Sequence, residues 1–69
     1  MSVFKTFRDK HNLTQTELAT QLGLRSQAAI SQYENGRDPE IDIARKFIAF
    51  AKKKGDRYTL EDIYAPRIN

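Results

Sequence analysis

The sequence predicts an all-α fold, a compact domain of five helices spanning residues 1–69, from three observations. Apolar residues recur at helical spacing, and no stretch alternates strictly between apolar and polar residues as a half-buried strand does. Two capping signatures, Thr14–Glu17 and Thr59–Asp62, mark helix starts. Gly23 and Gly55 stand where helical patterns stop, as expected of a residue that adopts the left-handed conformation easily.

The size and composition of the chain exclude several classes of protein. A chain of 69 residues buries only roughly 60% of its unfolded surface, so its core must be compact. It contains no cysteine and no cluster of metal-ligand residues, so no disulfide, metal site or cofactor is expected. His11 is the single histidine, and no nucleophile–base pair or phosphate loop is visible. We therefore expect no catalytic residue and no enzyme activity.

The charge of the chain favours an anionic partner without identifying it. Twelve lysines and arginines outnumber nine acids, which gives a net charge of +3. The first ten residues carry charges where a signal peptide would be apolar. No apolar run approaches the ~18–20 residues of a membrane span. These features predict a cytoplasmic protein without a membrane partner.

The first helix is expected at about residues 2–11, ended by Asn12. Thr14 opens the second helix, because its hydroxyl can accept a hydrogen bond from the Glu17 amide while the Glu17 side chain returns one. Gly23 ends that helix. The apolar residues expected to be buried by these two helices are Val3, Phe4, Phe7, Leu18, Ala19 and Leu22.

The third and fourth helices have their own start signals. Ser26 is the expected N-cap of the third helix, which runs to about Glu34 and is ended by Asn35–Gly36. Asp38–Pro39 is expected to open the fourth, because Asp caps helices and Pro is tolerated at the first helical position. The apolar residues that recur at helical spacing in this core helix are Ile41, Ala44, Phe47, Ile48 and Ala51.

The end of the fourth helix leaves two questions open. Lys52–Lys54 precede Gly55, and we favour a role in complementing the helix dipole over a phosphate or membrane patch. Ile43 and Phe50 lie beside the core stripe and either cover the first or fifth helix or remain exposed for a partner. A short fifth helix follows, with its cap, anchors and end at Thr59, Leu60, Ile63 and Ala65–Pro66.

Residues 13–37, LTQTELATQLGLRSQAAISQYENGR, form a helix-turn-helix pattern, two short helices joined by a glycine-containing turn. On the second of these helices, Ile30 and Tyr33 are spaced to pack inward together with Ala29. The opposite stripe is uncharged and rich in hydrogen-bonding groups, and it begins beside Gln27. Its members are Ala28, Ser31, Gln32 and Asn35.

The composition of this stripe indicates contact with DNA bases. A solvated helix face usually carries Lys and Glu, which form helices better than Ser or Asn. A base-reading face uses Gln to pair with adenine, Ser to bond several bases and Ala to contact a thymine methyl. Gln15, Arg25 and Arg37 flank the stripe at positions suited to phosphates. We therefore favour DNA contact over an ordinary wet surface.

With these motifs, nearly the whole chain resembles the Cro/CI family of phage repressors and the wider bacterial XRE-type regulators. The pieces that carry the resemblance are LTQTELATQLG at 13–23, ISQYENG at 30–36, Pro39 and YTLEDIY at 58–64. It implies a lambda-repressor-like fold and a nucleoid-associated repressor of a bacterial host that occludes an operator. One departure is LRSQAA between Gly23 and Ile30, six residues where the commonest pattern has five. Either the turn is longer or the third helix starts earlier.

The resemblance also implies roles for individual residues. Gln15 contacts a phosphate and braces the recognition helix, while Arg8 pairs with Glu34 and ties the motif to the core. The expected base contacts are Gln27, Ala28, Ser31 and Gln32. The expected DNA backbone contacts are Gln15, Arg25, Ser26, Asn35 and Arg37.

A weak homodimer paired on a pseudo-palindromic operator is expected, because one short recognition helix reads only a few base pairs. By resemblance and by leftover apolar surface, its interface is placed at Tyr64, Pro66 and Ile68. The lack of a second domain before Asn69 resembles Cro proteins more than full-length CI repressors, although a shortened CI-type chain would look the same. The alternative is an antitoxin that binds its toxin through Ile43, Phe50 or the tail at 64–68. No small-molecule ligand is expected.

Overall fold

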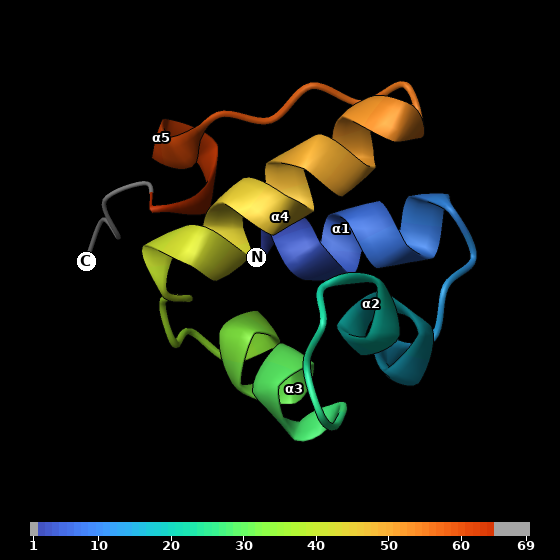
Figure 1. The fold of residues 1–69 in the computed structure, drawn as a ribbon, viewed down its shortest axis with the longest axis vertical. Coiled ribbons are helices and arrows are strands. Elements are labelled where there is room, and N and C mark those ends of the chain that lie inside the picture. Colours follow the sequence, from blue (N-terminus) through green and yellow to red (C-terminus); the bar gives the residue numbers. More distant parts are fainter. Residues whose placement is uncertain (1, 65–69) are drawn as a thin grey trace.

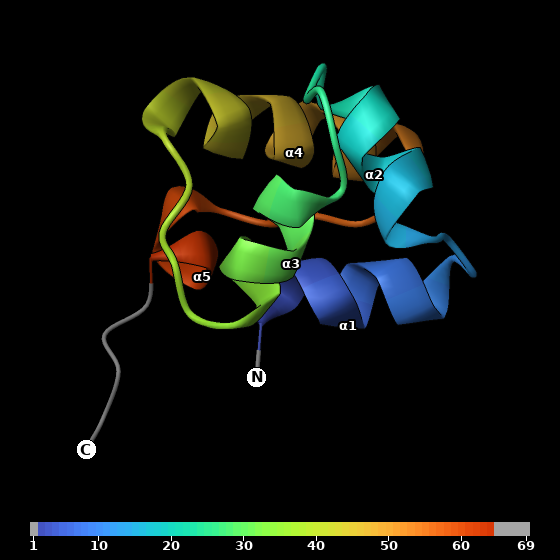
Figure 2. The ribbon, with the colours of Figure 1, turned by 90° about the horizontal axis from the view of Figure 1, so that it is seen from below.

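The computed structural model describes residues 2–64, and that range contains five α-helices and no strand. The helices are α1 (Val3–Lys10), α2 (Gln15–Gln21), α3 (Ala28–Glu34), α4 (Ile41–Lys53) and α5 (Leu60–Ile63). In Figure 1, α2 and α3 lie below α1 and α4, and α5 lies beside the first half of α4. Figure 2 shows α4 along one edge of the molecule and α1 along the opposite edge. The predicted all-α fold is confirmed. No helix within residues 2–64 is long and apolar enough to cross a bilayer.

The core is built from aromatic rings of α1 and α4. The ring centroids of Phe4 and Phe47 are 4.5 Å apart, and Phe7 meets Phe47 edge-on at 5.2 Å. Such pairs contribute about 0.5–1.5 kcal/mol beyond the burial of their area. The motif helices reach this centre with fully buried side chains, those of Leu18, Leu22 and Ile30. The buried side chains of α2 and α3 therefore pack against the core formed by α1 and α4, which fixes the position of both motif helices.

Both predicted capping boxes are present. The Thr14 hydroxyl accepts from the Glu17 amide at 3.0 Å, and the Glu17 carboxylate accepts from the Thr14 amide at 2.8 Å. Thr59 and Asp62 exchange the same two bonds at 3.2 and 2.9 Å. Gly23, with φ of +73°, ends α2 in the left-handed conformation that the sequence predicted.

The predicted start of α3 is wrong. The N-cap position is occupied by Gln27, one residue later than predicted, with helical backbone angles and no side-chain cap bond. The Ser26 hydroxyl still accepts from the amide of Ala28, the first residue of α3, at 3.3 Å. Four of the six residues between Gly23 and Ile30, residues 24–27, thus belong to the turn rather than to α3.

The predicted start of α4 at Asp38–Pro39 is also wrong. The helix begins at Ile41, after an extended Glu40 with φ of −63° and ψ of 155°. Pro39 is buried in the preceding loop, and its carbonyl oxygen accepts from the Tyr64 hydroxyl at 2.5 Å. The extended backbone of Glu40 thus separates Pro39 from the first turn of α4.

The assignment of Ile41 to the core stripe of α4 is wrong, because Ile41 is 50% exposed. As the first residue of the helix it lies beyond the end of the core, and Ile43 fills the position instead at 8% exposure. Ile43 is therefore unavailable to a partner. Phe50 is half-buried and meets Phe7 edge-on at 5.7 Å. The rest of the buried stripe is Ala44, Phe47 and Ala51.

Candidate nucleic-acid interface

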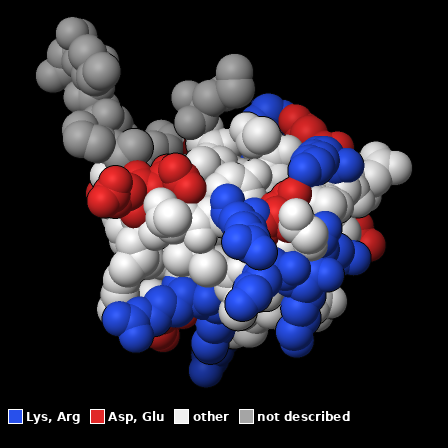
Figure 3. Space-filling view, turned by 90° about the horizontal axis from the view of Figure 1, so that it is seen from above, with Lys and Arg blue, Asp and Glu red and all other residues white. Residues whose placement is uncertain are grey.

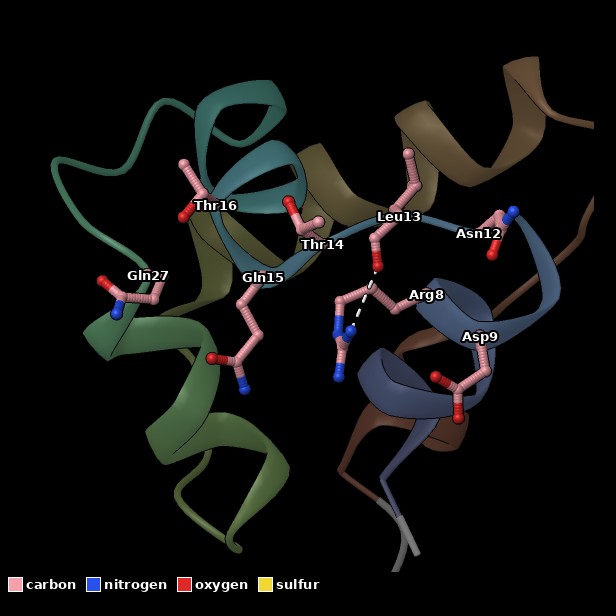
Figure 4. A pocket seen from close by; sticks show the side chains of 8 residues that line it. All are labelled: Arg8, Asp9, Asn12, Leu13, Thr14, Gln15, Thr16 and Gln27. Carbon is pink, nitrogen blue, oxygen red and sulfur yellow. Dashed lines mark hydrogen bonds between the residues drawn. The ribbon is translucent and has the colours of Figure 1, made fainter.

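The amino termini of α2 and α3 converge on one side of the molecule, where α3 lies at the front in Figure 2. Between them and the end of α1 is an open hollow of about 540 Å³. In Figure 4, the Gln15 side chain descends from α2 between α3 and Arg8, and Gln27 stands at the start of α3. The hollow is lined mainly by polar residues, namely Arg8, Asp9, Asn12, Leu13, Thr14, Gln15, Thr16 and Gln27.

The two faces of α3 differ as the sequence predicted in burial. Ile30 and Tyr33 point inward and are 0% and 4% exposed, and the Tyr33 hydroxyl donates to Glu40 at 3.2 Å. Among the residues expected to contact bases, three are exposed and Ser31 is half-buried. The exposed three are Gln27, Ala28 and Gln32. The outer face therefore presents amide and small side chains without a formal charge.

Two further residues of this face make local contacts that limit their freedom. The Asn35 side-chain amide donates to the Ser31 carbonyl at 2.9 Å, so it caps the carboxyl end of α3. Arg37 donates from Nη1 to Oε1 of Gln32, while its Nη2 lies 3.4 Å from a Glu40 oxygen. Within residues 2–64, the Gln32 amide nitrogen has no hydrogen-bond partner, which leaves it available to an incoming acceptor.

Arg8, Gln15 and Glu34 form a brace that joins α1, α2 and α3. The Arg8 guanidinium meets the Glu34 carboxylate through two parallel bonds of 2.7 and 3.1 Å. The Gln15 amide donates to the same carboxylate at 3.1 Å, and Arg8 Nη1 donates to the Leu13 carbonyl at 3.1 Å. Bidentate arginine–carboxylate pairs have strict geometry. The brace therefore holds the ends of all three helices in one arrangement.

The brace is largely buried, and its burial and hydrogen bonds shift the pKa values of Arg8 and Glu34. The side chains of Arg8 and Glu34 are 15% and 7% exposed. Burial alone would raise the pKa of the Glu34 carboxyl, but the hydrogen bonds from Arg8 and Gln15 outweigh it, and the pKa is lowered. The hydrogen bond to Glu34 raises the pKa of Arg8. Both groups are thus ionised and mutually neutralised at neutral pH.

The remaining predicted site residues are not part of the brace. Arg25 and Ser26 are exposed in the turn between α2 and α3. Tyr64 is half-buried after α5, where its hydroxyl binds the Pro39 carbonyl. Pro66 and Ile68, the other expected dimer residues, lie outside the described residues.

Sequence reasoning missed one charged cluster, at Asp56. This residue is buried, at 9% exposure, and its carboxylate accepts hydrogen bonds from Lys10 and from His11 Nε2, the latter at 2.7 Å. Both bonds lower the pKa of the Asp56 carboxyl, and the bond from Lys10 has the larger effect. The cluster joins the end of α1 to the loop after α4. Among the described residues, no group of acids and histidines has the arrangement of a metal site.

Two short helices at a tight turn, with an exposed uncharged stripe on the second, define a helix-turn-helix DNA-binding domain. The sequence matches the helix-turn-helix family over residues 4–55, which is most of the chain. The protein therefore belongs to this family, of the XRE type, whose members are DNA-binding regulators and not enzymes. Searches of the curated proteins and of the solved structures returned no match.

Proposed function

We propose that the protein is a Cro-like transcriptional repressor of phage or prophage origin that reads an operator half-site with α3 in the major groove. Bound there, it blocks transcription by occupying the site, in the cytoplasm of a bacterial host. The observation that carries this proposal is the uncharged outer face of α3, held in a fixed orientation by the brace of Arg8, Gln15 and Glu34. Rigid support of the reading face favours sequence-specific contact over loose electrostatic association.

In this proposal the base contacts come from Gln27, Ala28, Ser31 and Gln32. Gln15 contributes a phosphate contact without leaving the brace, because its Nε2 carries two hydrogens and only one is directed at Glu34. Exposed Arg25 supplies a positive charge from the turn. The remaining backbone contacts are assigned to Ser26, Asn35 and Arg37.

The proposal includes a weak homodimer that pairs on DNA. Two-fold related recognition helices read half-sites about 34 Å apart, which doubles the number of contacts. The interface is assigned to Tyr64, Pro66 and Ile68. Ile41 supports this position, because it is half-exposed and lies in the first turn of α4, just after the Pro39 carbonyl that Tyr64 binds.

Selection of bound sequences from a random duplex pool tests the proposal. We expect one enriched motif with two inverted half-sites, and sedimentation at high protein concentration should give two protomers per site. The Gln32→Ala variant, selected in parallel, should give a motif with lower information at one position in each half-site. A pool without enrichment would contradict sequence-specific reading, and a saturated complex of one protomer on every strong site would contradict the dimer.

The second candidate is an antitoxin that also regulates its own promoter. One observation favours it: half-buried Phe50 lines a depression of about 250 Å³ together with Leu13 and Lys54. A toxin side chain could insert there, whereas Ile43 is buried and no longer a candidate. Co-expression with a toxin encoded beside the gene, followed by purification of a stable complex lost in Phe50→Ala, would support this role.

A further inference from the structure

Among residues 2–64, four lysine and arginine side chains form ion pairs and seven do not, and four of those seven lie on α4 while Arg25, Lys54 and Arg57 lie in turns or loops. Lys5, Arg8, Lys10 and Arg37 each form an ion pair with a carboxylate. On α4, by contrast, four exposed cations pair with no carboxylate among residues 2–64. We call these four residues the α4 cation surface: Arg45, Lys46, Lys52 and Lys53.

The four cations share one face of α4. Arg45 and Lys52 are seven residues apart, as are Lys46 and Lys53, so each pair lies two turns, about 10 Å, apart along the helix axis. Exposed Ala49 lies between the pairs and leaves room for close approach. The opposite face of the helix is the buried core stripe. The result is a double row of positive charge along a rigid element.

The helix dipole explains only half of this surface. Lys52 and Lys53 stand in the last turn of α4, where cations are favourable. Arg45 and Lys46 lie in the second turn of α4, where the helix dipole does not stabilise a positive charge. Asp42 precedes them at the spacing of a helical ion pair, yet it forms none with either. Arg45 and Lys46 therefore have no evident part in stabilising the helix.

The α4 cation surface belongs to a different helix from the outer face of α3, and within it the Lys46 ammonium lies beside Gly23, in the turn between α2 and α3. Figure 2 views the molecule with α3 in front, and Figure 3 views it from the opposite side, where many lysine and arginine side chains gather. The molecule measures 31 × 25 × 22 Å between its outermost Cα positions. We infer that a duplex held by α3 leaves Arg45, Lys52 and Lys53 open, and the capture experiment below tests this.

We propose that the α4 cation surface binds the phosphate backbone of a second duplex segment, without reading its sequence. Duplex DNA carries one charge per about 1.7 Å of axis and releases counterions when unpaired cations meet it. The surface has no amide or aromatic side chain to read a base. A membrane-surface helix needs a wide exposed apolar face, whereas that of α4 is buried. The joining of two duplexes rests on the proposed function of α3. Binding of a duplex to the α4 cation surface does not depend on that function.

A two-step capture experiment tests this inference. A biotinylated duplex with the selected site is fixed to beads and saturated with protein, and a labelled duplex of unrelated sequence is then added. The test variant is Arg45→Gln/Lys52→Gln, and the control Lys5→Gln/Arg57→Gln removes the same charge from exposed side chains outside α4. We expect wild type and control to capture the second duplex, and the test variant to lose capture while it retains affinity for the fixed site.

Salt dependence gives a second measure of the same surface. A site that neutralises four phosphates should weaken about 150-fold between about 50 and 200 mM salt, and one that neutralises two only about 12-fold. In wild type, affinity for the second duplex should therefore fall about 150-fold over this range. In Arg45→Gln/Lys52→Gln it should fall only about 12-fold. Thermal unfolding of each variant verifies that it is folded.

Several results would overturn the inference. These are equal capture by wild type and the test variant, no capture by wild type, or preferential binding of polyglutamate or phosphatidylglycerol vesicles over duplex DNA. Failure of the proposed function looks different. The protein would then not hold the fixed site in a sequence-dependent way, yet it would still bind unrelated duplex through Arg45 and Lys52.

Discussion

Arg37, in the loop after α3, donates a hydrogen bond to the side-chain oxygen of Gln32, on the outer face of α3. Arg37 also lies 3.4 Å from Glu40, so its guanidinium is held from two directions. A residue assigned to the DNA backbone is thereby coupled to one assigned to a base. The pair adds orientation to the Gln32 amide, whose nitrogen stays free to meet the DNA.

Replacing Gln32 with Ala should cost roughly 1–3 kcal/mol of binding free energy on the selected site and little on random DNA, because a base-directed amide is lost. Gel-shift titration on both duplexes measures this. Gln21→Ala, which removes an exposed amide from the end of α2, serves as the control and should bind as wild type does. Unchanged specific binding of Gln32→Ala would show that the reading face is misassigned.

Arg37→Ala should weaken both specific and non-specific binding and lower the salt slope by about 0.9, the loss of one phosphate contact. Specific binding should fall further than non-specific binding, because Gln32 also loses its orientation. Arg37→Lys retains the charge but not the forked geometry. It should therefore keep the salt slope and lose part of the specificity. If Arg37→Ala changed both affinities equally, the contact with Gln32 would have no role in reading.

Glu34→Gln should destabilise the protein by about 3–5 kcal/mol, because the Arg8 charge is left buried without its partner. Thermal or urea unfolding measures the free energy of unfolding. Glu61→Gln is the matched control on an exposed carboxylate, and its change should stay within about 1 kcal/mol. A melting temperature of Glu34→Gln equal to that of wild type would mean that the brace is solvated and contributes nothing to stability.

Asp56 makes stability depend on pH in the acid range. Its carboxyl has a lowered pKa in the folded protein, so the stability it contributes is complete above its ordinary value of 3.8. That contribution is lost as the pH falls through the lower folded value. The difference in melting temperature between wild type and Asp56→Asn should therefore be largest at neutral pH and shrink below about pH 4.

Melting curves at several pH values between neutrality and strong acid test this expectation. Asp9→Asn is the control, because Asp9 pairs with Lys5 at the surface, where both side chains are more than half exposed. Its melting temperature should follow that of wild type at every pH. A difference between wild type and Asp56→Asn that is independent of pH would show that Asp56 acts by packing and not through its charge.

The sequence predicted those features that neighbouring residues determine. Thr14 and Glu17 are three residues apart and form their capping box within α2 itself. Gly23 ends α2 because its own backbone favours the left-handed conformation. The alternation of burial along α3 follows from helical periodicity alone. These elements need no information from the rest of the chain.

The features that could not be predicted depend on contacts between distant residues. α4 begins at Ile41, after an extended Glu40, and the Pro39 carbonyl before it binds Tyr64, which is 25 residues further along the chain. Ile41 reads as a core residue until the start of the helix is known. Glu34 meets Arg8 across 26 residues, and only the family resemblance indicated that pair. Nothing in the local sequence distinguishes Asp56 from an ordinary surface acid.

The Asp56 cluster also bears on how fast the chain folds and unfolds. Its bonds to Lys10 and His11 close segments of 46 and 45 residues, whereas the helices form from near neighbours. Closing so long a loop costs chain entropy before the contact returns any stabilisation, so we expect it to form after the rate-limiting step. Disrupting it should then accelerate unfolding and leave the refolding rate almost unchanged. The cluster would thus form late in folding and, by slowing unfolding, lengthen the lifetime of the native state.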